Sequence, residues 1–141
     1  MSAERRAPSE GGVVRPEGWP RPSGYSDGIE ATGRLVSISG QIGWDPVTGT
    51  FATDDFAEQT AQALRNVVAV LRAGGAGPEH LVRLTWYVTD RAAYVAARRA
   101  IGAAYRETLG AHYPAMSVVI VAGLLEERAL VEIEATAVVP A

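Results

Sequence analysis

The chain has 141 residues, no cysteine and a formal net charge of −3. This length predicts one domain with a hydrophobic core of its own. The negative charge gives no sign of binding to nucleic acid or an anionic membrane, and no stretch approaches the ~20 apolar residues that span a bilayer. Because the N-terminal segment lacks the apolar core of a secretory signal, we expect a cytoplasmic protein.

The missing residue types narrow the chemistry. Without cysteine there is no disulfide, thiolate nucleophile or sulfur-based zinc site. All thirteen basic residues are arginine, so Schiff-base chemistry and attachment of pyridoxal phosphate are excluded. His80 and His112 have no pairing motif, and each is expected at the surface or at a helix end. Carboxylates, hydroxyls, arginines, backbone groups and water remain, with no metal and no cofactor expected.

Residues 1–22, rich in arginine and proline, are predicted to be a flexible arm, and residues 23–141 a single domain. Alternating and β-branched stretches predict strands, and apolar stripes at a spacing of three and four predict helices. Asp55 and Glu58 resemble a capping box at the first helix, and Gly74 with Gly75 ends it. The expected strands are 25–31, 34–42, 81–88, 116–124 and 130–139, and the expected helices are 55–73 and 91–109.

This order, ββαβαββ, predicts an α+β domain in which two helices pack on one face of a mixed sheet. The stretch 116–124 is almost wholly apolar and has no polar face to turn to water. Each exposed Val or Ile side chain would forgo about 1.5–3 kcal/mol. We therefore expect another copy of the chain to bury the second face of the sheet.

Two glutamates interrupt the last apolar stretch. In a strand, Val131 and Ile133 would share one face, whereas Glu132 and Glu134 would share the other. Taken alone, such carboxylates are either a solvated strand face or part of a polar site.

Several short motifs together resemble the RidA (YjgF) family over about residues 25–138. They are Gly24-Tyr25-Ser26, Ser39-Gly40-Gln41-Ile42, Asp45-Pro46-x-Thr48-Gly49, Glu58-Gln59-Thr60 with Asn66, Pro114-Ala115 and Val131-Glu132-Ile133-Glu134-Ala135. The resemblance implies a chorismate-mutase-like fold and a homotrimer with pockets between subunits. It also implies hydrolysis of reactive enamines or imines, such as 2-aminoacrylate, to keto acids and ammonia without a metal or cofactor.

The resemblance assigns roles to individual residues. Tyr25 matches an aromatic residue that lines the pocket, and Ser39 and Gly40 match the pocket floor. Glu132 matches the acidic residue near the substrate nitrogen, where it would move a proton or position water. Glu134 is expected to pair with an arginine or with backbone amides.

The chain departs from the family pattern at the residue that binds the substrate carboxylate. Met116 stands where the deaminases have arginine, and losing a charge-assisted hydrogen bond worth ~1.5–3 kcal/mol lowers affinity about 10- to 150-fold. Val118 replaces a common cysteine and makes the pocket more apolar, and Ser117 is expected to be a pocket hydroxyl. Arg98 is either a relocated cation at the pocket edge or a solvated helix residue beside Arg99.

The sequence thus predicts a deaminase, a hydrolase of C=N bonds, for a substrate larger or less acidic than 2-aminoacrylate. The alternative is a non-catalytic trimer that binds a small apolar metabolite between subunits. RNA cleavage ranks last, because no basic-aromatic surface and no histidine pair are visible. Trp44 and Trp86 either line an enlarged pocket or only pack against neighbours.

Overall fold

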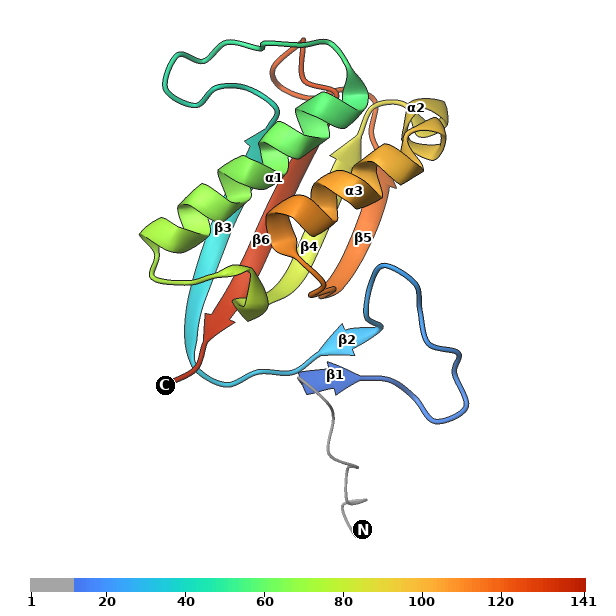
Figure 1. The fold of residues 1–141 in the computed structure, drawn as a ribbon, viewed down its shortest axis with the longest axis vertical. Helices are drawn as coiled ribbons and strands as arrows, with labels where there is room; N and C mark the ends of the chain where they lie inside the picture. The colour runs from blue at the N-terminus through green and yellow to red at the C-terminus, as the bar shows by residue number, and fades with distance from the viewer. Residues whose placement is uncertain (1–11) are drawn as a thin grey trace, which may run out of the picture.

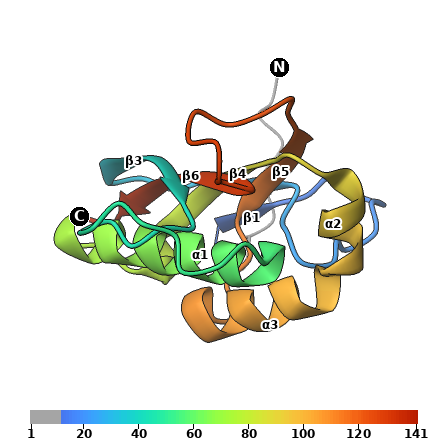
Figure 2. The same cartoon turned by 90° about the horizontal axis from the view of Figure 1, so that it is seen from above.

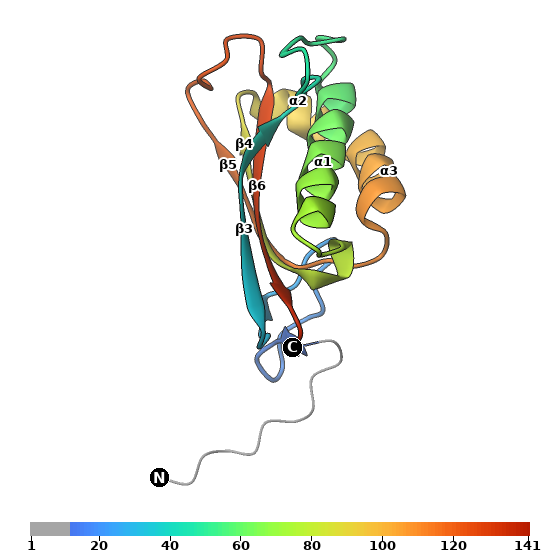
Figure 3. The ribbon, with the colours of Figure 1, turned by 90° about the vertical axis from the view of Figure 1, so that its left-hand side faces the viewer.

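The computed structural model describes residues 12–141. One mixed sheet with strand order β3-β6-β4-β5 forms the first layer, and the helices form the second, on one face of the sheet (Figures 1 and 3). The elements of these two layers are β3 (Arg34–Ile42), α1 (Phe56–Ala73), β4 (Leu81–Val88), α2 (Arg91–Ala96), α3 (Arg98–Leu109), β5 (Ala115–Ile120) and β6 (Val131–Val139).

The last strand of the chain lies inside the sheet. β6 pairs antiparallel with both β3 and β4, and β5 pairs parallel with β4 at the sheet edge. A parallel pair needs a long connection, which α2 and α3 supply. The view from above shows α1 and α3 beside each other under the sheet, which leaves its other face open (Figure 2).

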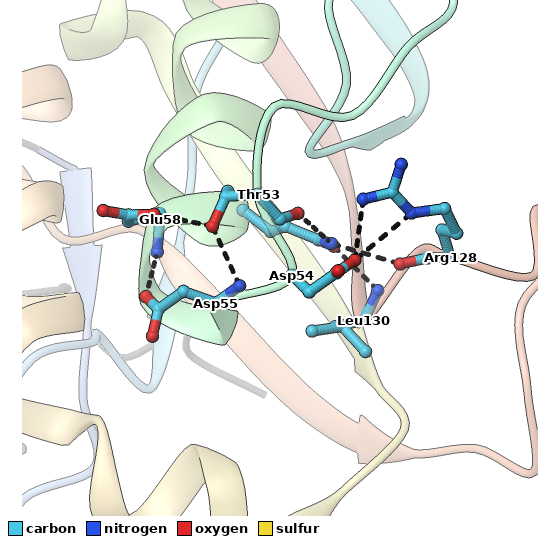
Figure 4. Close-up of polar contacts among 7 residues, drawn as sticks. Thr53, Asp54, Asp55, Glu58, Arg128 and Leu130 are labelled. Carbon is cyan, nitrogen blue, oxygen red and sulfur yellow. Dashed lines mark hydrogen bonds and ion pairs between the residues drawn. The ribbon is translucent and has the colours of Figure 1, made fainter.

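The predicted start of α1 is confirmed. The Asp55 carboxylate accepts a hydrogen bond from the Glu58 backbone N–H at 2.9 Å, as an N-cap does. The Glu58 carboxylate does not return to the Asp55 backbone; instead it accepts from the Thr53 hydroxyl at 2.6 Å (Figure 4). The helix ends at Ala73 with Gly74 as its C-cap, and Gly75 follows with φ of 73°.

The predicted alternation along β6 is confirmed as well. Every second residue is buried beneath the helices, whereas the residues between them are only partly buried. The core joins these β6 residues to the apolar stripe of α1. The buried residues of the two elements include Val131, Ile133, Ala135, Ala137, Phe56, Leu64, Val67 and Leu71.

The predicted first strand, 25–31, is wrong in extent and in place. Only Gly28–Ile29 form a strand, β2, which pairs with β1 (Val13–Val14) in a separate two-stranded sheet (Figure 1). The backbone N–H of Ser26 instead donates a hydrogen bond to the carbonyl of Pro114 at 3.1 Å, immediately before β5 begins. The main sheet therefore has four strands. β1 lies within the predicted arm, and residues 1–11 of that arm lie outside the described residues.

The predicted helix 91–109 is two helices. Ala97 separates them, with φ of −94° and ψ of 5°. α3 buries Ile101, Tyr105 and Leu109 and packs on α1, whereas α2 buries no residue fully. The bend lets the apolar stripe of α3 follow α1, so tertiary packing decides the break.

β5 ends at Ile120, earlier than the predicted 124. Its partner β4 ends at Val88, and the last backbone hydrogen bond there joins Val121 N–H to the Val88 carbonyl at 2.9 Å. Past this point the chain has no strand to pair with and leaves the sheet. No helix among residues 12–141 is long and apolar enough to cross a membrane.

Candidate functional site

The uncovered face of the sheet carries the two glutamates of β6. Glu132 lies directly opposite Tyr87 of β4, and Glu134 lies diagonal to it. The Tyr87 hydroxyl donates to Glu134 Oε1 at 2.6 Å, and this hydrogen bond is the main cause that raises the pKa of Tyr87 above its ordinary value. The predicted partner of Glu134, an arginine or a backbone amide, is therefore wrong. The partner is the long side chain of Tyr87 on the neighbouring strand.

Glu132 has different surroundings. It accepts no hydrogen bond from any residue within 12–141, and its carboxyl group lies against Gly40 of β3 so closely that a Cβ on Gly40 would overlap it. The pairing of β3 with β6 is irregular between Ile38 and Gln41, so Ser39 and Gly40 form a bulge at this point. The bulge and the missing side chain together make room for a free carboxyl group.

A groove of about 770 Å³ lies on the other, helix-bearing side of the sheet, at the β5 edge. We call it the β5–α3 groove. Met116 and Val118 form its floor, because they share the helix-facing side of β5 with their register partners on β4. Its lining residues from four segments include Tyr25, Trp86, Met116, Val118, Arg98 and Arg106.

Aromatic side chains make up the wall beneath α3. Tyr105 and Tyr113 stack with ring centroids 5.1 Å apart and planes 8° apart. The Tyr105 hydroxyl donates to the His112 carbonyl at 2.6 Å, and burial raises the pKa of Tyr105, so this donor stays protonated. Trp86 also lines the groove, and its Nε1 is buried without a hydrogen-bond partner among the described residues.

The predicted site residues fall into two groups. Met116 and Ser117 are neighbours in β5 and therefore point to opposite faces, as strand geometry requires. Within one chain, Glu132 and Met116 lie on opposite faces of the sheet. The groove holds Tyr25, Arg98 and Met116, and the open side carries Glu132, Ser39, Gly40 and Ser117.

The sequence prediction missed Arg106 and the tyrosine wall. The signal was present, since Arg98, Gly102 and Arg106 recur at intervals of four and so share one side of a helix. Their neighbours Ile101 and Tyr105 belong to the buried side of the same helix. Trp86 lines the groove, although most of its side chain is buried in the core.

The histidines are held by the backbone. The Nδ1 atom of His80 accepts from the Gly77 N–H at 3.0 Å, and Nε2 of His112 donates to the Leu81 carbonyl at 2.7 Å. Over residues 12–141, no three His, Asp or Glu side chains are grouped so as to hold a metal ion.

Comparisons with known proteins agree with this architecture. The family model described as Endoribonuclease L-PSP matches residues 20–139. A RutC family protein of Pyrococcus horikoshii is 36% identical over 126 residues, which cover 89% of this chain and 95% of the relative. The 2-iminobutanoate/2-iminopropanoate deaminase of Salmonella typhimurium is 37% identical over 114 residues, which cover 81% and 86% of the two chains.

A solved structure gives the same result. A protein of unknown function of the conserved Rid family from Yersinia pestis matches with a TM-score of 0.79 and 36% identity, covering 90% of this chain and 97% of that one. A mixed four-stranded sheet with one face covered by helices and the other face open thus defines a Rid-type α+β domain. The chain belongs to the RidA (YjgF) family, the one that the matching model describes as Endoribonuclease L-PSP.

Proposed function

We propose that this protein is a RidA-like deaminase that hydrolyses an enamine or imine to a carbonyl compound and ammonia. The observation that carries the proposal is the free carboxyl group of Glu132. This residue belongs to the central strand β6, and its carboxyl group lies against Gly40 of β3. Family membership supports it, since relatives 31% and 37% identical to this chain are named 2-iminobutanoate/2-iminopropanoate deaminases.

The reaction needs a group that moves protons. Water adds to the imine carbon to give a carbinolamine, and the C–N bond then breaks, so that nitrogen leaves as ammonia and a carbonyl remains. Glu132 takes a proton from the attacking water and gives one to the leaving nitrogen, a role worth typically 10²- to 10⁴-fold in rate. Glu134 is unsuited to it, because its carboxylate is occupied by the Tyr87 hydroxyl.

The complete site requires a second copy of the chain. In one chain the β5–α3 groove and Glu132 lie on opposite sides of the sheet, so the groove of one subunit must meet the open face of the next. A homotrimer with three such contacts is the assembly that the family resemblance implies. Apolar side chains on the open face, such as Leu35 (65% exposed) and Val119 (41% exposed), support burial there.

The groove floor sets the substrate apart from that of the named deaminases. Met116 offers no charge or hydrogen-bond donor, so a small 2-imino acid such as 2-aminoacrylate finds no partner for its carboxylate at this point. The substrate is larger than 2-aminoacrylate or holds its acidic group elsewhere.

A panel of amino-acid-derived imines tests the activity. Wild-type protein should accelerate hydrolysis of at least one of them, and Glu132→Gln should lower kcat at least 100-fold. Glu134→Gln is the matched control on the same strand face, and it should keep most of the activity. The proposal fails if no imine is hydrolysed faster with the protein than without it, or if Glu132→Gln equals wild type.

A second variant probes the altered floor. Met116→Arg should gain hydrolysis of 2-aminoacrylate, because it restores a cation where the family binds the carboxylate. Ammonia release from enzymatically generated 2-aminoacrylate measures the gain. A variant that folds yet shows none would mean that more than this one contact has changed.

The second candidate function is non-catalytic binding of a small apolar metabolite. The apolar floor of Met116 and Val118 favours it. A metabolite that raises the melting temperature without being consumed would support this role. RNA cleavage ranks last, because both histidine rings are engaged with the backbone and the net charge is −3.

A further inference from the structure

The β5–α3 groove has an apolar floor and a cationic rim. Met116 and Val118 present only apolar atoms at the bottom. Arg98 and Arg106 line the groove from α3, and they are eight positions apart, a rise of about 12 Å along the helix axis. Charge is therefore available to a ligand at the helix side of the groove and not at its floor.

The Arg106 side chain extends back along the helix toward Arg98. A Cβ on Gly102 would lie 3.4 Å from Nη1 of Arg106, so the Arg106 guanidinium extends over Gly102, back toward Arg98. Gly102 lies between the two arginines, about one helical turn from each.

Among residues 12–141, no acidic side chain neutralises the two arginines of the groove. No Asp or Glu is among its described lining residues, and neither arginine forms an ion pair within residues 12–141. Such a pair of free guanidinium groups beside a concave surface suits a carboxylate, which arginine binds with two parallel hydrogen bonds.

The rest of the groove suits a flat apolar body. Tyr25 stands at one side, 44% exposed, and the stacked Tyr105 and Tyr113 rings form a fixed wall. Aromatic rings pack well against such faces. A volume of about 770 Å³ lies within the range of sites for drug-sized ligands, far above the need of a four-carbon imino acid.

We propose that the β5–α3 groove binds a carboxylate-bearing imine or enamine with an aromatic body. The substrate carboxylate binds to Arg98 and Arg106. The aromatic ring of the substrate packs on Met116 and Val118, with Tyr25 on one side and the stacked Tyr105 and Tyr113 on the other. This assignment names the substrate class of the proposed deaminase and therefore rests on that function. It makes Arg98 and Arg106 the residues that determine specificity in place of an arginine at position 116.

Binding of stable product-like acids tests the inference without turnover. Phenylpyruvate should bind to the full-length protein at least tenfold more tightly than pyruvate or 2-oxobutanoate in calorimetric titrations. Arg98→Gln and Arg106→Gln should each weaken phenylpyruvate binding about tenfold, as expected for loss of one charge-assisted hydrogen bond. Arg99→Gln is the matched control, since Arg99 is adjacent on α3 and is absent from the groove lining.

The outcomes separate this inference from the proposed activity. Arginine-dependent binding of phenylpyruvate without hydrolysis of any imine would uphold the groove assignment and overturn the deaminase. Imine hydrolysis that is unchanged in Arg98→Gln and Arg106→Gln would uphold the deaminase activity and overturn the groove assignment. Equal affinity for phenylpyruvate and pyruvate, or equal loss in Arg99→Gln, would overturn the assignment of the groove.

Discussion

Glu132 and Glu134 share one strand face but differ in what surrounds each carboxyl group. Glu134 accepts a 2.6 Å hydrogen bond from Tyr87, whereas Glu132 lies beside the missing side chain of Gly40. A carboxylate already held by a donor is a poor proton carrier, and a free one beside an open backbone is a good one. The difference of two residues along β6 thus separates a structural acid from a candidate catalytic acid.

The Tyr87–Glu134 hydrogen bond predicts a dependence of stability on alkaline pH. The folded-state pKa of Tyr87 lies above the ordinary value of ~10, so the folded chain binds more protons than the unfolded chain above that pH. The contribution to stability is complete below pH ~10 and is lost as pH rises through the raised pKa.

Ultraviolet titration of the phenolates checks this prediction. The difference between wild type and Tyr87→Phe should show one tyrosine ionising above pH ~10. In Glu134→Gln that ionisation should move down toward the ordinary value, because the accepting charge is gone. A difference midpoint at or below the ordinary value in the wild type would contradict the hydrogen bond.

At the scale of elements, the first turn of α1 holds two loops near the start of β6. The buried Gln59 donates from Nε2 to the carbonyls of Thr53 and Arg128, at 3.0 and 3.1 Å, and its Oε1 accepts from the Leu130 N–H at 2.9 Å. Figure 4 shows the partners Thr53, Arg128 and Leu130 together with the ion pair between Arg128 and Asp54, in which the N···O distance is 2.8 Å. β6 begins immediately after Leu130, so Gln59 also sets the entry of the strand that carries Glu132.

Gln59→Leu should lower the free energy of unfolding by about 3 kcal/mol, because it leaves three partly buried backbone groups without their partner. Arg128→Ala is the matched control: it removes an exposed ion pair to Asp54 and a contact with the Phe51 ring, worth at most ~1 kcal/mol. Urea denaturation of both variants measures the two losses. Equal losses would show that the surface pair, and not Gln59, holds the loops.

At the scale of the whole molecule, the open face of the sheet predicts assembly. Val118, Val119 and Ile120 of β5 are 39%, 41% and 49% exposed in one chain, which is unusual for three successive apolar residues of a strand. Because successive residues alternate, Val119 lies on the open face beside Tyr87. The predicted homotrimer would bury this surface.

Sedimentation should therefore give a particle of three 14.9 kDa chains. Val119→Glu should dissociate it, because a carboxylate without a partner is costly to bury in an interface. Val47→Glu is the matched control, since Val47 is 91% exposed in a loop outside the sheet. A wild-type chain that sediments as a monomer at micromolar concentration would contradict the prediction.

Much of the fold could be predicted from local patterns. The alternation in β6, the Asp55 cap and the stripe of α1 are each readable within one element, because side-chain period and capping depend on near neighbours in the chain. The strand predicted at 25–31 and the unbroken helix 91–109 failed, because the chain entering β5 and the surface of α1 decide those segments.

The candidate site divides in the same way. The missing lysine and cysteine, the methionine at position 116 and the glutamate pair follow from the amino-acid sequence, because they concern which groups exist. The tertiary structure alone shows that Tyr87 binds Glu134, that Arg106 joins Arg98, and that the sheet separates Met116 from Glu132. Those relations depend on which strands are neighbours and which way each residue faces after folding, and contacts between distant segments leave no period in the sequence.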